Sequence, residues 1–269
     1  MELNNIYNMD CIEGMKQLEE NSIDLIVTSP PYNVGIDYDS WDDNMPWDKY
    51  LEWCEQWLTE CFRVLKPDGR ICVNHYFCNS PRKNGDTCSR FPLFDLKNIM
   101  DRIGFNTHKI AIWDDMTIAK QSAWGSWKSA SSPYISCPYE GILIAYKHQW
   151  KKENSGESTI SKNDFMEGCS GVWHIGTTQS YTKANFPERL PQLCIDLLTY
   201  KGDVVLDPFS GSGTTCYVAK AMNRGFIGFE ISKAYWKESI SRLNGLPYKV
   251  VETDNPYGAE RSNQISIWD

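Results

Sequence analysis

The order of apolar and polar residues along the chain predicts strands that alternate with helices. Residues 23–28 read IDLIVT, an aliphatic and β-branched run that Ser29-Pro30-Pro31 stops, so we expect a buried strand that ends in a rigid loop. Apolar residues then recur at helical spacing over 46–65. The sequence KPDG at 66–69 predicts a turn after that helix, and 70–74 is the next expected strand.

The second half of the chain continues this alternation. Strands are expected at 109–113 and 141–146, while the polar stretches 116–138 and 151–164 predict loops or a small inserted subdomain. The later expected elements are a helix at 187–200, a strand at 203–207, a helix at 214–223 and a strand at 226–230. A strand, a helix and a strand within about 30 residues form the βαβ unit of a parallel sheet, so the pattern predicts an α/β fold.

The composition is that of an ordinary soluble globular protein. Of its 269 residues, 41% are hydrophobic and 23% are charged. No apolar run approaches the roughly 18 to 20 residues of a membrane span, and the first ten residues lack the basic stretch and apolar core of a secretion signal. The ten cysteines form no CxxC pair. We therefore expect reduced thiols in the cytoplasm, no membrane contact and no metal site.

The net charge of −8 does not exclude a nucleic-acid partner, because the acidic residues gather in one part of the chain. Residues 1–96 carry 8 basic and 17 acidic side chains, residues 97–190 carry 11 and 9, and residues 191–269 carry 8 and 9. Nucleic-acid affinity depends on Lys and Arg that neutralise phosphates. We expect a basic strip from residues 97–190 beside the functional site, with the acidic stretch 37–60 turned away from nucleic acid or in a partner contact.

A glycine-rich segment after the expected strand at 203–207 indicates a nucleoside site. Residues 207–215 read DPFSGSGTT, and its glycines permit a tight turn whose backbone N–H groups can approach a ligand. Glu230 follows the next strand, where a carboxylate would accept the hydrogens of ribose hydroxyls. An ordinary strand-to-helix turn is the alternative for the glycines alone. No lysine follows Gly213 as in a P-loop, and Cys216 occupies the third glycine position of a dinucleotide site.

The loop after the strand at 23–28 carries a second motif, Ser29-Pro30-Pro31-Tyr32. Its prolines stiffen the backbone so that the Ser29 hydroxyl and the Pro30 carbonyl can act as fixed acceptors, while Tyr32 offers a flat face for stacking. Such a site suits a planar ring that carries an amino group. A Pro-Pro loop with a packed tyrosine is the alternative.

Together the two motifs resemble those of the S-adenosylmethionine-dependent DNA amino-methyltransferases. The segment 29–32 matches the family's (D/N/S)PPY catalytic motif, and 207–215 matches its DPFxGSGTT cofactor motif. The catalytic motif comes first, which is the circularly permuted order of the family's β group. Residues 7–11, 63–69 and 185–190 are similar to further family segments, and the resemblance covers most of residues 4–240.

The resemblance implies a Rossmann-like methyltransferase fold, with a mostly parallel twisted sheet and helices on both faces. Residues 1–114 would form the catalytic half of the domain, and 181–269 the cofactor-binding half. Residues 115–180 would form a small target-recognition region with one core strand at 141–146. The strands that end at Thr28 and Asp207 would lie side by side.

The resemblance also implies the residues that hold S-adenosylmethionine. The glycine-rich turn and Phe209 would hold its methionine part, Glu230 its ribose, and Asp10 with Cys11 its adenine. A helix cap or turn is the alternative for Asp10. The complete expected set is Asp10, Cys11, Ala184, Phe186, Pro187, Asp207, Pro208, Phe209, Ser210, Gly211, Ser212, Gly213, Thr214, Thr215 and Glu230.

The implied reaction transfers a methyl group to an exocyclic amine of a base in double-stranded DNA. The base must leave the duplex, at a cost of a few kcal/mol. Tyr32 would stack on the flipped ring, while Ser29 Oγ and the Pro30 carbonyl would accept the amine hydrogens. In this family serine at the first motif position occurs mostly in cytosine-N4 enzymes and aspartate mostly in adenine-N6 enzymes. Ser29 therefore favours cytosine N4, with adenine N6 as the alternative.

DNA contacts are expected from cations and aromatic side chains in the middle region, although surface lysines and core tryptophans are the plain alternative. The candidates are Lys120, Trp124, Trp127, Lys128, Lys147, Lys151 and Lys152. His174 is expected to be a packed histidine rather than a ligand. The resemblance also suggests a homodimer and a companion restriction endonuclease.

Three other functions remain as alternatives. A methyltransferase that acts on protein glutamine or RNA usually places the cofactor motif first, in contrast to this chain. A non-catalytic DNA-binding or cofactor-sensing protein on the same fold would not need both motifs intact. An NAD-dependent oxidoreductase is disfavoured by the missing third glycine.

Overall fold

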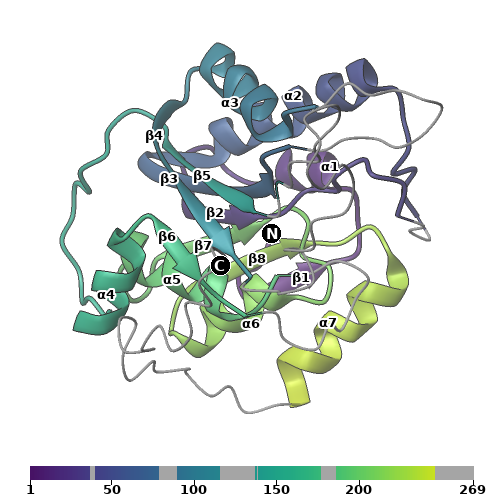
Figure 1. Cartoon of the computed structure of the whole chain (residues 1–269). Helices are drawn as coiled ribbons and strands as arrows, with labels where there is room; N and C mark the ends of the chain where they lie inside the picture. Colours follow the sequence, from purple (N-terminus) through teal and green to yellow (C-terminus); the bar gives the residue numbers. More distant parts are fainter. Residues whose placement is uncertain (37–39, 79–89, 116–136, 138, 177–185, 246–269) are drawn as a thin grey trace, which may run out of the picture.

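One mixed sheet forms the centre of the molecule, with helices on both of its faces (Figure 1). The computed structural model describes residues 1–269 except 37–39, 79–89, 116–136, 138, 177–185 and 246–269. Within that part of the chain the sheet has eight strands in the order β1-β8-β7-β2-β3-β5-β4-β6. Their bounds are β1 (Asn5–Tyr7), β2 (Ile23–Thr28), β3 (Leu65–Tyr76), β4 (Asn106–Asp114), β5 (Glu140–Tyr146), β6 (Val172–His174), β7 (Val204–Asp207) and β8 (Gly225–Phe229).

The sheet is mostly parallel, as expected. Among the described strands only β5 runs antiparallel, paired with β3 on one side and β4 on the other. Strand β2 pairs in parallel with β7, where Leu25 lies opposite Val205 and Ile26 opposite Leu206. The predicted neighbourhood of the two motif-bearing strands is therefore confirmed, and their carboxyl ends lie at the same edge of the sheet.

The helices form one layer on each face of the sheet. Helices α1 (Cys11–Met15), α2 (Trp47–Val64) and α3 (Pro92–Ile103) pack on one face. Helices α5 (Arg189–Leu198), α6 (Thr214–Ala221) and α7 (Lys233–Gly245) pack on the other, with α4 (Lys162–Cys169) beside α5 and β6. Both sides of the sheet are thus buried, which explains the continuous apolar run of β2.

Helix α2 confirms the helical spacing expected at 46–65. Pro46 stands directly before its first residue, where a missing backbone N–H costs nothing. Its inner face buries a set of side chains at three- and four-residue spacing: Tyr50, Cys54, Trp57, Leu58, Cys61 and Val64. This face belongs to the apolar core on one side of the sheet, and its Tyr50 hydroxyl donates to the Pro31 carbonyl in the loop after β2.

One local expectation was wrong, and several elements were not predicted. The KPDG turn at 66–69 lies inside β3, because β2 pairs with β3 on both sides of it: Ile23 opposite Leu65, and Leu25 opposite Arg70. The extra residues form a bulge, whose carbonyls at Pro67 and Gly69 accept backbone N–H bonds from the segment after β5. Six further elements were not predicted: β1, α1, α3, α4, β6 and α7. The strands β1 and β6 and the helices α1 and α4 are too short to show clear periodicity, whereas α3 and α7 were overlooked.

No described helix is both long and apolar enough to span a membrane. The described residues also contain no cluster of His, Cys, Asp or Glu arranged to hold a metal ion.

Candidate active site

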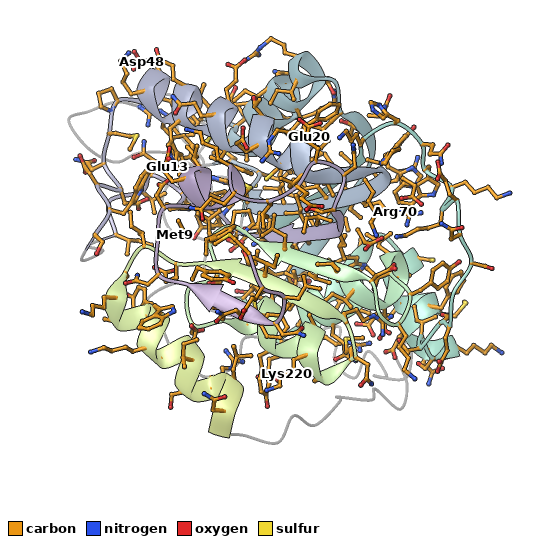
Figure 2. The ribbon with its side chains drawn as sticks, turned by 180° about the vertical axis from the view of Figure 1, so that it is seen from behind. Met9, Glu13, Glu20, Asp48, Arg70 and Lys220 are labelled. Atoms are coloured by element: carbon orange, nitrogen blue, oxygen red, sulfur yellow. The ribbon has the colours of Figure 1, made fainter. Side chains whose placement is uncertain are left out.

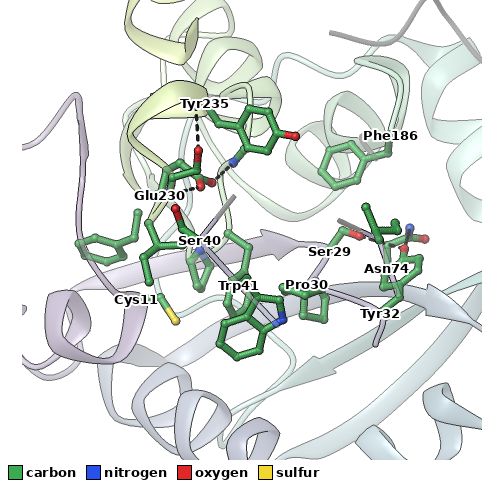
Figure 3. A pocket seen from close by; sticks show the side chains of 18 of the residues that line it. Cys11, Ser29, Pro30, Tyr32, Ser40, Trp41, Asn74, Phe186, Glu230 and Tyr235 are labelled. Atoms are coloured by element: carbon green, nitrogen blue, oxygen red, sulfur yellow. Dashed lines mark hydrogen bonds between the residues drawn. The ribbon is translucent and has the colours of Figure 1, made fainter. Parts of the chain in front are cut away.

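A cavity of about 290 Å³ opens where the parallel strands end. Its wall combines residues that directly follow β1, β2, β7 and β8 with residues near the carboxyl ends of β3 and β4. Because β5 runs the other way, it contributes its first residue, Glu140. Ligands of open α/β sheets bind at this edge, and small-molecule pockets measure roughly 300 to 1,000 Å³. Figure 3 shows Ser29, Tyr32 and Asn74 on one side of the cavity and Glu230 with Cys11 on the other.

The predicted catalytic loop, residues 29–32, forms part of this wall. The Ser29 hydroxyl donates to the Tyr32 hydroxyl oxygen at 2.9 Å, and the Tyr32 hydroxyl donates to Glu140 Oε2, also at 2.9 Å. Asn74 Nδ2 donates to both the Tyr32 oxygen and Glu140 Oε2, each at 2.7 Å. The pKa of Tyr32 is raised well above its usual value, by burial and then by the nearby Glu140 carboxylate, so its hydroxyl keeps its proton.

The Tyr32 ring is held from the α2 side of the sheet. His75 stacks on it at a centroid distance of 4.2 Å, and the Tyr50 hydroxyl donates to the Pro31 carbonyl at 2.7 Å. Because that hydroxyl hydrogen is used, His75 Nε2 is the donor in its 3.1 Å contact with the Tyr50 oxygen. Complete burial lowers the pKa of His75 to about 3, so the ring is neutral in ordinary buffers.

Asp43 organises the segment that follows the catalytic loop. Its carboxylate accepts four backbone N–H groups, from residues 33–36, at 2.8 to 3.1 Å. Asn33 adds two bonds to the backbone of Met45 and adopts a φ of 56°. This buried clamp places Ile36 on the cavity wall. One acid of the stretch expected on an outward face is therefore a structural residue of the site.

The glycine-rich segment divides into a lining part and a buried part. Pro208, Phe209 and Gly211 line the cavity. Gly213 has a φ of 79°, the left-handed region that favours glycine, and a Cβ there would lie 2.9 Å from Ser239 Cβ. The expected cofactor residues that are buried and do not reach the described cavity wall are Pro187, Asp207, Ser210, Ser212, Gly213, Thr214 and Thr215.

Asp207 connects the two motifs. It accepts hydrogen bonds from Thr28 Oγ1 at 2.7 Å and from the Phe209 N–H at 3.1 Å. Burial raises its pKa to about 6, and the hydrogen bond from Thr28 opposes this shift. Asp207 therefore holds the ends of β2 and β7 together from behind the cavity.

Two carboxylates mark the other side of the cavity. Glu230 accepts the Gly211 N–H with one oxygen at 2.8 Å and the Ser232 N–H with the other at 2.7 Å. Asp10 is the N-cap of α1, and its Oδ1 accepts the backbone N–H groups of the second and third residues after it. This is the helix cap that the sequence offered as the alternative role of Asp10. Both carboxylates line the cavity, as do Cys11 and Phe186, whereas Ala184 lies outside the described residues.

The proposed DNA contacts need correction where the structure describes them. The Lys152 side chain is 10% exposed, and its ammonium pairs with Asp24 at 2.9 Å and Asp203 at 3.0 Å, at the edge of the sheet opposite the cavity. Lys147 is buried and donates to Asn21 Oδ1 and to two backbone carbonyls at that edge. Lys151 directly precedes Lys152 and is exposed. Lys120, Trp124, Trp127 and Lys128 lie outside the described residues.

The basic side chains expected from residues 97–190 do not form part of the described cavity wall. Within the described residues this wall contains the acids Asp10, Glu140 and Glu230 but neither lysine nor arginine. His174 also differs from expectation: it is 59% exposed, and its Nδ1 lies 3.2 Å from Asp114 Oδ2 across the β4–β6 pair. A three-residue edge strand buries only its central side chain, Trp173.

Sequence reasoning missed several residues of the site. Asn74 and Tyr76 come from β3, and Glu140 from the start of β5. Strand β5 was expected, but its direction was not, and the direction decides which of its ends reaches the cavity. Trp41 and Trp53 also line the cavity and pack on each other at 4.4 Å. The tryptophans that follow the catalytic loop, Trp41 before the expected helix and Trp53 within it, were the available signal.

Comparisons with known proteins agree with this geometry. The family model N6_N4_Mtase, described as DNA methylase, matches residues 23–241. The Type II methyltransferase M.HpaI of Haemophilus parainfluenzae is 32% identical over 87% of this chain and 72% of its own length. M.MjaVI of Methanocaldococcus jannaschii, also a Type II methyltransferase, is 45% identical over 58% of this chain and 78% of its own.

Two solved structures share the fold. TTHA0409 of Thermus thermophilus, assigned as a DNA modification methylase and solved with S-adenosyl-L-methionine, has a TM-score of 0.72 at 25% identity over 90% of this chain and 95% of its own. The cytosine-N4-specific PvuII DNA methyltransferase has a TM-score of 0.70 at 22% identity over 90% and 88%. The chain belongs to the N4-cytosine/N6-adenine DNA methylase family and is an S-adenosylmethionine-dependent DNA amino-methyltransferase.

Proposed function

We propose that this enzyme methylates the N4 amine of cytosine in double-stranded DNA, within a specific sequence. The observation that carries the proposal is the neutral hydroxyl of Ser29 at the first position of the catalytic motif, with its hydrogen bonded to Tyr32. Serine at this position is typical of the cytosine-N4 enzymes that the sequence resembles. Methylation of adenine N6 is the second candidate, because both amines have two hydrogens to donate to the same acceptors.

The catalytic loop would bind and orient the target base. Ser29 Oγ and the Pro30 carbonyl would accept the two amine hydrogens, which directs the nitrogen lone pair into the cavity. Tyr32 would contact the flipped ring, and His75 fixes the tyrosine orientation from behind. Asn74 supports a polar partner at this place: it lines the cavity, yet its buried Oδ1 has no hydrogen-bond partner among the described residues.

The residues around the other half of the cavity fit S-adenosylmethionine. The Glu230 carboxylate lines the cavity beside the Gly211 turn, and an ionised carboxylate offers about four acceptor sites, enough for ribose hydroxyls besides its backbone bonds. Phe209 and Phe229 offer apolar surface, and Asp10 places an acceptor for an adenine amine at the same wall. When bound, the cofactor supplies the methyl group on its sulfonium.

The test is methyl transfer from labelled S-adenosylmethionine to double-stranded DNA of diverse sequence, followed by nucleoside analysis. We expect N4-methylcytosine as the product, and Tyr32→Ala should abolish transfer while the protein still binds the cofactor. Tyr146→Ala is the matched control, because Tyr146 lies at the opposite end of β5 and packs against Trp150. N6-methyladenine would favour the second candidate, and unlabelled DNA with intact cofactor binding would contradict both.

We further propose that residues 115–180 recognise the DNA sequence and that Lys120, Trp124, Trp127 and Lys128 contact the DNA. The Type II names of the relatives support a companion restriction endonuclease that cuts the methylated sequence, and the resemblance supports a homodimer. Sequencing of modified bases after expression in a methylation-free host gives the recognition site. Protection of that site from cleavage tests the companion endonuclease. Light scattering of the purified protein tests the homodimer.

A further inference from the structure

We infer that Glu140 is a positioning residue that sets the direction of a hydrogen-bond chain from Ser29 through Tyr32 to Glu140. In this direction Ser29 Oγ turns only acceptor lone pairs towards the target amine. The inference rests on the proposed transfer to an exocyclic amine, and it applies equally to cytosine N4 and adenine N6.

The three residues come from distant parts of the chain. Ser29 and Tyr32 follow β2, whereas Glu140 begins β5, and all three line the cavity. Strand β5 reaches this edge with its first residue because it is antiparallel to β3, where Tyr76 lies opposite Glu140. The Ser29–Tyr32 and Tyr32–Glu140 oxygen distances are both 2.9 Å, within the usual range for hydroxyl hydrogen bonds.

The direction of the chain follows from counting hydrogens. Glu140 Oε2 accepts from the Tyr32 hydroxyl and from Asn74 Nδ2. The single Tyr32 hydrogen is therefore used, and the Ser29–Tyr32 contact needs the Ser29 hydrogen. If Tyr32 donated to Ser29 instead, the Tyr32 oxygen and Glu140 Oε2 would face each other without a hydrogen between them. The Glu140 carboxylate thus sets the orientation of the Ser29 hydroxyl, which is two hydrogen bonds away.

Asn74 also stabilises this direction of the hydrogen-bond chain. Its Nδ2 lies 2.7 Å from the Tyr32 oxygen and 2.7 Å from Glu140 Oε2, so its two hydrogens serve both acceptors. The reversed amide would place an oxygen against the carboxylate. The Tyr32 oxygen now accepts from Asn74 and Ser29 while it donates to Glu140, which uses its hydrogen-bonding capacity in full.

The orientation matters because a hydroxyl is both donor and acceptor. The target amine approaches with hydrogens, so a Ser29 hydrogen that pointed into the cavity would oppose it. With that hydrogen held by Tyr32, the Ser29 oxygen is preorganised as an acceptor before the base arrives. Glu140 itself need not touch the base.

The experiment compares Glu140→Met, which removes the acceptor at nearly constant size, with Glu140→Gln, whose amide oxygen can take the place of Oε2. Each is measured on double-stranded DNA with S-adenosylmethionine, alone and combined with Tyr32→Phe. Glu140→Met should lower kcat roughly 10- to 100-fold through misorientation, with KM for DNA and cofactor within about twofold. Glu140→Gln should retain most of kcat, because the acceptor remains.

The variant that combines Tyr32→Phe with Glu140→Met separates the hydrogen-bonding role of Glu140 from a packing role. Once Tyr32→Phe has removed the middle hydroxyl, Glu140→Met should lower kcat no further. Glu153→Met, at an exposed position beyond β5, controls for loss of a glutamate, and thermal melting verifies folding. Wild-type kcat in Glu140→Met, equal losses in the Gln and Met variants, or additive losses in the double variant would each overturn the inference. Failure of the wild-type protein to methylate DNA would instead overturn the proposed function.

Discussion

At the residue scale, the buried carboxyl of Asp207 behaves differently from an ordinary surface aspartate. It accepts the Thr28 hydroxyl and the Phe209 N–H, but it lies in a fully buried place that raises its pKa to about 6. In the unfolded chain its pKa is close to 3.8, the ordinary value for aspartate. Because the folded-state pKa is the higher one, this group stabilises the fold fully below about pH 4. That contribution is lost as the pH rises through about 6.

The Asp207→Asn variant should remove this pH dependence. The amide keeps one oxygen for Thr28 and Phe209 and has no proton to release. The difference in unfolding free energy between variant and wild type should shift by up to about 3 kcal/mol between pH 4 and 7, in favour of the variant at pH 7. Urea unfolding across this range measures it. A difference that does not change with pH would contradict the buried-acid argument.

The contribution of His75 to stability changes with pH in the opposite direction to that of Asp207, so the two effects must be separated. Its folded-state pKa of about 3 lies below the usual 6.5, so its contribution is lost as the pH falls below about 6.5. Both proteins in the comparison contain His75, and the difference between them therefore cancels its effect. In the wild type alone the two groups partly compensate.

At the element scale, the segment after β2 is ordered by one side chain rather than by a strand or helix. The Asp43 carboxylate accepts the N–H groups of residues 33–36, and the same segment supplies cavity-wall residues. Helix α2 then follows immediately and supports Pro31 through Tyr50. A rigid catalytic loop here depends on a charged acceptor inside the loop and on a helix below it.

Asp43→Asn should loosen this loop, because an amide offers only one acceptor oxygen and turns an NH₂ group towards backbone donors. We expect the unfolding free energy to fall by about 2 to 3 kcal/mol, the range for hydrogen bonds to charged groups, and methyl transfer to slow at saturating substrate. Asp42→Asn is the matched control, since Asp42 is exposed and accepts the Asn44 N–H at 3.1 Å. Equal stability and activity in the two variants would contradict the clamp.

At the scale of the whole molecule, the acidic first third of the chain belongs mainly to one layer. Figure 2 shows Glu13 and Asp48 on the side of α1 and α2, with Lys220 on the opposite side of the sheet. Other acids of this third are used internally: Asp24 pairs with Lys66 and Lys152. The net charge of −8 therefore says little about the surface that faces DNA. Two lysines of the mildly basic middle segment, Lys147 and Lys152, form internal bonds instead.

Variants of Lys152 and Lys128 should distinguish a lysine that stabilises the fold from one that contacts DNA. Lys152→Met should reduce the unfolding free energy by about 1 to 3 kcal/mol, because Asp203 loses an ion-pair partner in a poorly solvated place. It should leave the salt dependence of DNA binding unchanged. Lys128→Ala should instead reduce the slope of log affinity against log salt by about 0.9 if Lys128 contacts one phosphate. A changed slope for Lys152→Met would restore that lysine as a DNA contact.

The sequence by itself determined several elements with strong periodicity and the two motif loops, although helices α3 and α7 were not predicted. Strand β2, helix α2 and the β7–α6–β8 unit appear close to their expected places, because local apolar spacing and proline or glycine positions specify them. Resemblance supplied the family and the pairing of β2 with β7. The exposed place of His174 and the buried ion pair of Lys152 were not determined, since burial depends on neighbours far away in the chain.

Only the tertiary structure decided how the site is completed. The sequence indicated a strand at 141–146 but could not give its direction, and the antiparallel pairing with β3 is what brings Glu140 to the cavity. Asn74 likewise reaches Tyr32 across a gap of 42 residues. Local sequence specifies how a segment folds, whereas sheet order and strand direction determine which distant side chains meet, because those depend on packing over the whole molecule.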